Sequence, residues 1–156
     1  MEKTATTLWF EKDAEAAATH YVKGIPGSKI ISVERFGKQG PGPEGTAMLV
    51  SIEFAGRPFM LMNCAPLFTL NESVSFTIYA EDQMEVDFLW AHMSEGGTTS
   101  RCGWLKDRWG FSWQIVPKRF VELMTKSSPD VKGKVFDAMM QMTKLDIAKL
   151  EAVAKG

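Results

Sequence analysis

The chain has 156 residues, of which 45% are hydrophobic and 24% charged, as expected for about one globular domain with a sizeable core. Its formal net charge of −1 argues against broad electrostatic attraction to nucleic acid or an anionic membrane, and no apolar run approaches the roughly 20 residues that span a bilayer. The N-terminus lacks a signal-peptide pattern, and the two cysteines, Cys64 and Cys102, fit buried thiols, so we expect a cytoplasmic protein.

The first part of the chain predicts a strand, a helix and three further strands. Residues 4–10 are β-prone, and Asp13 is typical of the residue that caps a helix start. The apolar residues of that helix share one face: Ala14, Ala17, Ala18 and Tyr21. Strands are expected next at residues 28–36, 46–55 and 57–64.

The segment 37–45, between the first two of these strands, is rich in glycine and proline. It favours a long hairpin connection or a mobile flap. A phosphate-binding loop is disfavoured, because no Gly-Lys-Ser/Thr follows it and no helix begins after it.

The second part of the chain begins in the same order. Residues 73–80 predict a strand, and Asp82 with Glu85 three positions later forms a capping-box pattern at a helix start. Two strands are expected after this helix, at residues 98–105 and 111–116.

Alternation in the last of these strands separates two kinds of side chain. Phe111, Trp113 and Ile115 point toward a core, whereas Gln114 points to the opposite face. Pro117 ends the strand, because proline lacks the N–H that a ladder needs. The run is either an ordinary hairpin strand or the floor of a pocket that contains Gln114.

The remainder of the chain predicts helices. A short helix is expected at residues 117–125, a second after Ser128-Pro129, and a third at residues 146–154. Methionines recur along these helices. They indicate core packing or, alternatively, a groove for a partner helix.

Two segments, about residues 4–64 and 73–117, therefore share the order strand, Asp cap, helix and antiparallel strands. A unit of this size cannot cover both faces of its sheet alone, so two copies are expected to pair. The pattern predicts an α+β fold, with helices outside a curved mixed or antiparallel sheet. Residues 1–126 would form this two-module domain, and residues 127–156 a C-terminal helical extension of the same domain.

Several runs carry a resemblance to a known family: Leu8-Trp9-Phe10, Gly40-Pro41-Gly42-Pro43, Phe59-Met60-Leu61-Met62-Asn63, Gly103-Trp104-Leu105-Lys106-Asp107 and Trp113-Gln114-Ile115-Val116-Pro117. With them the chain resembles, over nearly its whole length, the PhnB-like branch of the vicinal oxygen chelate superfamily. That branch is often labelled 3-demethylubiquinone-9 3-methyltransferase. The resemblance implies paired βαβββ modules that form a cleft. The second module has room for only two strands after its helix, so we expect it to be shortened.

In metal-dependent members of the superfamily, His, Glu or Gln residues around the cleft hold a divalent ion. The resemblance places Thr6, Ser75 and Gln114 at the corresponding positions, with Asn63 nearby. Hydroxyls and neutral amides are poor ligands for a transition metal, so we predict no metal and no cofactor. The methyltransferase label is unsupported by these residues, because no strand–Gly-x-Gly–helix element is present to hold S-adenosylmethionine.

The expected pocket combines apolar walls with hydroxyls and amides, which suits a small, partly aromatic ligand. The residues predicted to face it are Leu8, Phe10, Asn63, Ser75, Thr77, Tyr79, Trp104 and Gln114. Trp104 would stack on a planar group or pack in the core. No catalytic set is readable, because His20 and His92 fall on the helices.

The sequence thus favours metal-free binding of a small molecule. The alternatives are a non-catalytic interaction module that uses the C-terminal helices, and a weakly metal-dependent enzyme of glyoxalase or dioxygenase type. A homodimer is expected, because a shortened second module leaves a sheet edge to be paired. Whether the protein catalyses a reaction is left open.

Overall fold

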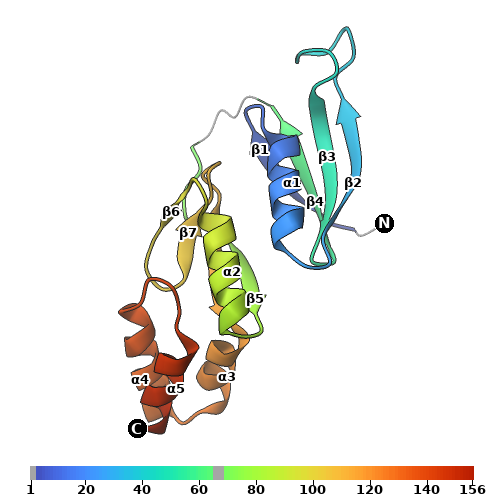
Figure 1. The fold of residues 1–156 in the computed structure, drawn as a ribbon. Coiled ribbons are helices and arrows are strands. Elements are labelled where there is room, and N and C mark those ends of the chain that lie inside the picture. The colour runs from blue at the N-terminus through green and yellow to red at the C-terminus, as the bar shows by residue number, and fades with distance from the viewer. Residues whose placement is uncertain (1–2, 65–68) are drawn as a thin grey trace. The chain divides into compact units, whose positions relative to one another are not determined.

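Two segments of similar pattern fold into two units, one from Met1 to Thr69 and one from Leu70 to Gly156. The computed structural model describes residues 3–64 and 69–156. In each unit an amphipathic helix lies against a four-stranded sheet (Figure 1). The α+β architecture and the repeated module are therefore confirmed. The proposed domain limits remain predictions.

The first unit contains five elements: β1 (Thr6–Phe10), α1 (Ala14–Gly24), β2 (Lys29–Arg35), β3 (Ala47–Phe54) and β4 (Arg57–Asn63). The strands lie in the order β1-β4-β3-β2, with β1 parallel to β4 and the other pairs antiparallel. Ala14, Ala17 and Ala18 of α1 are fully buried, which lets the helix pack closely on β3 and β4. The loop at residues 37–45 joins two antiparallel strands, as expected of a hairpin connection.

The start of α1 is capped differently from the prediction. Asp13 occupies the cap position, but its side chain makes no capping hydrogen bond. Instead the Ala14 N–H donates to Asn63 Oδ1, at 2.9 Å, and Asn63 Nδ2 donates to the Ala47 carbonyl at 2.8 Å. A residue from β4 therefore supplies the cap, because the parallel β1–β4 pair brings the end of β4 beside the helix start.

The second unit repeats this topology in its first five elements: β5 (Phe76–Ala80), α2 (Gln83–Ser94), β6 (Thr98–Thr99), β7 (Trp104–Lys106) and β8 (Ser112–Pro117). The strand order is β5-β8-β7-β6, with β5 parallel to β8. The predicted cap is confirmed here, since Asp82 Oδ1 accepts from the Glu85 N–H at 2.9 Å. Trp113 and Ile115 are fully buried, as their alternation predicts.

The expectation of only two strands after α2 is wrong. The run predicted as one strand at residues 98–105 is split into β6 and β7 by a turn in which Cys102 and Gly103 have φ angles of 59° and 80°. Those left-handed conformations end an extended strand. The second module therefore has all its strands, and it is shortened only in their lengths.

Three helices follow the second sheet: α3 (Lys118–Lys126), α4 (Pro129–Met140) and α5 (Ile147–Lys155). They surround one hydrophobic cluster, which contains Leu123, Val135, Met139, Leu145 and Leu150. We call residues 127–156 the tail. Met139 belongs to the cluster, so this part of the methionine pattern is core packing.

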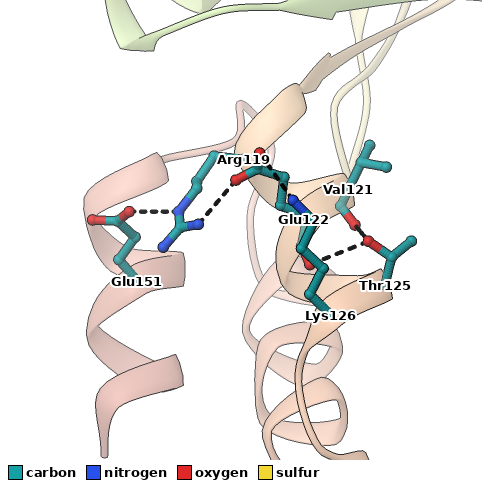
Figure 2. Close-up of polar contacts among 6 residues, drawn as sticks. All are labelled: Arg119, Val121, Glu122, Thr125, Lys126 and Glu151. Atoms are coloured by element: carbon teal, nitrogen blue, oxygen red, sulfur yellow. Dashed lines mark hydrogen bonds and ion pairs between the residues drawn. The ribbon is translucent and has the colours of Figure 1, made fainter.

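A surface clamp joins α3 to α5 (Figure 2). Arg119 Nε donates to Glu151 Oε1 at 2.7 Å, and its terminal nitrogen donates to Glu122 Oε2 at 3.0 Å. These hydrogen bonds raise the pKa of Arg119 and lower that of Glu122. Among the helices of the described residues, none is long and apolar enough to cross a bilayer.

Candidate functional site

The face of the second sheet that points away from α2 carries a row of three predicted site residues. We call it the open face. Gln114 on β8 lies directly opposite Thr77 on β5 and opposite Trp104 on β7. Side chains that are opposite one another across strands share one face of a sheet. Tyr79, two residues beyond Thr77, adds an aromatic ring that is 55% exposed.

Gln114 is held at one end. Its Nε2 donates to Ser75 Oγ at 2.9 Å, which fixes the plane of the amide. Its carbonyl oxygen can therefore accept a hydrogen bond from a ligand, and the Ser75 hydroxyl retains its own proton to donate. The structure thus brings Ser75, Thr77, Tyr79, Trp104 and Gln114 together on one surface.

Two further polar residues, which are not among the predicted site residues, extend this row. Ser112 precedes Gln114 by two positions on β8, so its side chain lies on the same face. It is only 3% exposed, and its Oγ has no hydrogen-bond partner within the described residues. A buried hydroxyl in this state costs about 1–3 kcal/mol. Strand alternation already places Ser112 on the face of Gln114, but it does not predict that the Ser112 hydroxyl is buried.

Lys106 lies opposite Ser112 on β7. Its ammonium nitrogen is 2.5 Å from Glu72 Oε1, and the hydrogen bond from Lys106 lowers the pKa of Glu72. The two charges compensate each other, so this end of the open face is polar with little net charge.

Leu8 and Phe10 do not lie on an open sheet face, contrary to the prediction. They are 4% and 3% exposed and belong to the core of the first unit. The face of β1 away from α1 instead carries Trp9, which is 40% exposed and opposite Met62.

The error comes from the length of one turn. The segment between β1 and α1 includes Glu11, Lys12 and Asp13, whereas only Glu81 and Asp82 separate β5 from α2. Aligning the two helix caps therefore shifts the strands by one residue, which moves every side chain to the opposite face. The turn lengths in the sequence were the signal that was missed, and Trp9 is the counterpart of Tyr79.

Asn63 and Thr6, which were also considered as site residues, make structural contacts within the first unit. Both ends of the Asn63 amide are used by the backbone of α1 and β3, as described above. Thr6 pairs with the buried Phe59 and shares its face of the sheet.

The donor set does not fit a divalent transition metal. Ser75 and Gln114 offer a hydroxyl and a neutral amide that are hydrogen-bonded to each other, and the Asn63 oxygen is occupied by a backbone N–H. Within residues 3–64 and 69–156, no group of three or more His, Cys, Asp or Glu side chains is arranged to hold a metal ion. The predicted lack of a bound metal remains a prediction.

The chain matches one family model and is similar to several solved structures. A family model described as 3-demethylubiquinone-9 3-methyltransferase matches residues 2–116. A solved structure described as a putative 3-demethylubiquinone-9 3-methyltransferase, PhnB protein, from Bacillus cereus is 29% identical, with a TM-score of 0.70, over 74% of this chain and 99% of that chain.

Two more distant structures share the fold. A protein from Pseudomonas aeruginosa is 17% identical, with a TM-score of 0.61, over 75% of this chain and 98% of that chain. A possible glyoxalase from Bacillus cereus is 13% identical, with a TM-score of 0.51, over 74% of this chain and 98% of that chain. No curated protein matches the sequence significantly.

Proposed function

The chain belongs to the PhnB-like family described as 3-demethylubiquinone-9 3-methyltransferase, with a vicinal oxygen chelate fold, and on that premise we propose that it binds a small, partly aromatic, uncharged molecule without a metal. The ligand lies on the open face of the second sheet. Trp104 stacks on its ring, and Gln114, Ser75 and Thr77 form hydrogen bonds with its polar substituent.

The observation that carries this proposal is the cross-strand row Thr77–Gln114–Trp104. Small-molecule sites combine apolar or aromatic walls with a few polar groups that fix orientation. The row has one ring to cover a planar group and a tethered amide to orient it. The compensated Lys106–Glu72 pair favours an uncharged ligand over an ionised one.

The activity in the family's name has no counterpart among the described residues. S-adenosylmethionine sites of the doubly wound type need a parallel sheet and a glycine-rich strand-to-helix turn. Here the described sheets contain one parallel pair each, and the glycine-rich segment lies between antiparallel strands. Binding is therefore the function that these residues support best.

Calorimetric titration and thermal-shift measurements with three probes test the proposal. 2-Naphthol is aromatic and neutral, 2-naphthoate carries a charge on the same ring system, and cyclohexanol has a hydroxyl without an aromatic ring. We expect 2-naphthol to bind most tightly and to raise the melting temperature. Equal responses to all three probes, or no response to 2-naphthol, would refute the proposal.

A matched pair of variants locates the site. Trp104→Ala is expected to weaken 2-naphthol binding about tenfold, because it removes the stacking surface. Trp109→Ala removes the same ring from the β7–β8 turn, which is not part of the cross-strand row, and should leave the affinity within about twofold. Elemental analysis of protein purified without chelators should show no stoichiometric metal, and a stoichiometric metal would favour the metal-dependent enzyme instead.

One observation supports the interaction-module alternative. Phe136 and Met140 stand one turn apart on α4 and are 46% and 40% exposed. If a partner protein binds at these residues, Phe136→Asp should abolish that binding and retain the binding of 2-naphthol.

A further inference from the structure

The tail is hydrogen-bonded to the turn that precedes Trp104. The Cys102 N–H donates to the Met142 carbonyl at 2.8 Å, and the Gly103 N–H donates to the Thr143 carbonyl at 2.8 Å. Both turn residues have left-handed φ angles, of 59° and 80°. For Cys102 that conformation is uncommon and needs support from its surroundings. The loop between α4 and α5 provides it.

Leu145 covers this turn. Its side chain is 1% exposed, and a Cβ placed on Gly103 would lie 3.3 Å from Leu145 Cγ and 2.7 Å from the Ile115 carbonyl oxygen. On the other side, the Ile115 N–H donates to the Gly103 carbonyl at 2.8 Å. Gly103 is therefore held between β8 and the tail, with no space for a side chain.

The tail loop is itself anchored to α2. Gln83 Oε1 accepts from the Ile147 N–H at 2.9 Å, and Gln83 Nε2 donates to the Leu145 carbonyl at 3.2 Å. Lys144 forms an ion pair with Asp87, with 2.5 Å between nitrogen and oxygen. The loop thus links the first turns of α2 to the β6–β7 turn.

Trp104 comes directly after this turn, in a strand of only three residues. A strand that short has few ladder hydrogen bonds of its own, so the position of its first residue depends on the adjacent turn. From these contacts we propose that the tail holds Trp104 in place for ligand binding, with Leu145 as the positioning residue. This inference rests on the proposed function of the open face.

The family match does not include this segment. It ends at residue 116, before α3 begins at Lys118, so Leu145 and the loop around it lie outside the matched part. Under this proposal, ligand affinity is coupled to the packing of the tail through the turn that precedes Trp104.

A fluorine label on tryptophan gives a readout that does not require a ligand. The protein is prepared with 5-fluorotryptophan, and the ¹⁹F resonance of Trp104 is assigned by its loss in Trp104→Phe. Leu145→Ala is compared with Leu150→Ala. Both remove a fully buried leucine from the same cluster, and Leu145 is the one whose side chain lies closest to the position that a Gly103 Cβ would take.

We expect Leu145→Ala to shift or broaden the Trp104 resonance and to weaken 2-naphthol binding about fivefold, because the stacking ring is no longer preorganised. Leu145→Ile should restore both. Leu150→Ala should leave the resonance in place and the affinity within about twofold. An unchanged Trp104 resonance in folded Leu145→Ala, or an equal change in Leu150→Ala, would overturn the proposal.

A second variant covers the case in which Leu145→Ala does not fold. Gln83→Ala removes the anchor on α2 and is expected to change the Trp104 resonance in the same direction; no change would overturn the proposal. If 2-naphthol does not bind the wild-type protein, the proposed function fails, whereas the resonance still decides whether the tail positions Trp104.

Discussion

At the scale of single residues, Asp107 organises the β7–β8 turn. Its Oδ1 accepts from the Trp109 and Phe111 N–H groups at 2.9 and 3.0 Å, and its Oδ2 accepts from Trp113 Nε1 at 2.8 Å. The carboxylate is 3% exposed. A buried charge is tolerated here because three donors surround it.

Replacing Asp107 by alanine removes the acceptor of these three hydrogen bonds. We expect Asp107→Ala to lower the free energy of unfolding by about 3 kcal/mol, measured by urea denaturation. The control is Asp137→Ala on the exposed side of α4, which should change stability by less than about 0.5 kcal/mol. Similar effects for the two variants would contradict the assigned role of Asp107.

At the scale of elements, the start of α1 depends on β4. The Ala14 N–H is satisfied by Asn63, a residue 49 positions away in the sequence, while the adjacent Asp13 makes no side-chain cap. The helix is therefore coupled to the sheet through its cap as well as through its apolar face.

This coupling predicts an unusual ranking of two alanine variants. Asn63→Ala should destabilise the protein by about 1–2 kcal/mol, whereas Asp13→Ala should cost less than about 0.5 kcal/mol. Hydrogen exchange of the first turn of α1 should accelerate in the former alone. A larger loss for Asp13→Ala would show that the adjacent residue is the true cap.

The junction of α2 with the tail predicts a pH dependence. The hydrogen bond from Lys144, followed by that from Gln83, lowers the pKa of Asp87 below the ordinary 3.8. A lowered folded pKa means that the pair stabilises the folded state above pH 3.8, and that this contribution is lost as the pH falls through the folded value.

Comparison with Asp87→Asn, a mimic of the protonated carboxyl, isolates this contribution from those of other carboxylates. The difference in urea midpoint between wild type and Asp87→Asn is expected to be largest near pH 5 and to disappear toward pH 2. A difference that does not change with pH would argue against the ion pair.

At the scale of the whole molecule, each sheet has one edge strand that is poorly suited to pairing with another chain. β2 has a register shift between Ile30 and Ser32, and β6 is only two residues long. Bulges and short edges hinder pairing with another chain. The other edge strands, β1 and β5, are regular in register and carry the exposed rings of Trp9 and Tyr79.

These edges underlie our proposal that the protein is a homodimer. Sedimentation velocity should show a species of about twice the chain mass of 17.4 kDa at micromolar concentration. Tyr79→Lys should shift the distribution toward the monomer, because it places a charge on an edge strand. A single 17.4 kDa species across a wide concentration range would refute the dimer.

The sequence alone determined the elements that depend on local chemistry. Alternation identified the buried side of β8 through Trp113 and Ile115, and the Asp82–Glu85 pattern located the start of α2. The repeat and the family motifs led to the correct fold. Strand alternation and helix capping depend on neighbours within a few positions, and the sequence records these directly.

Only the tertiary structure decided the features that join distant segments. The cap of α1 comes from Asn63, and the split between β6 and β7 occurs where Cys102 and Gly103 meet the tail. Each is set by a hydrogen bond or a packing contact between residues far apart in the chain, and no local periodicity encodes such a pairing.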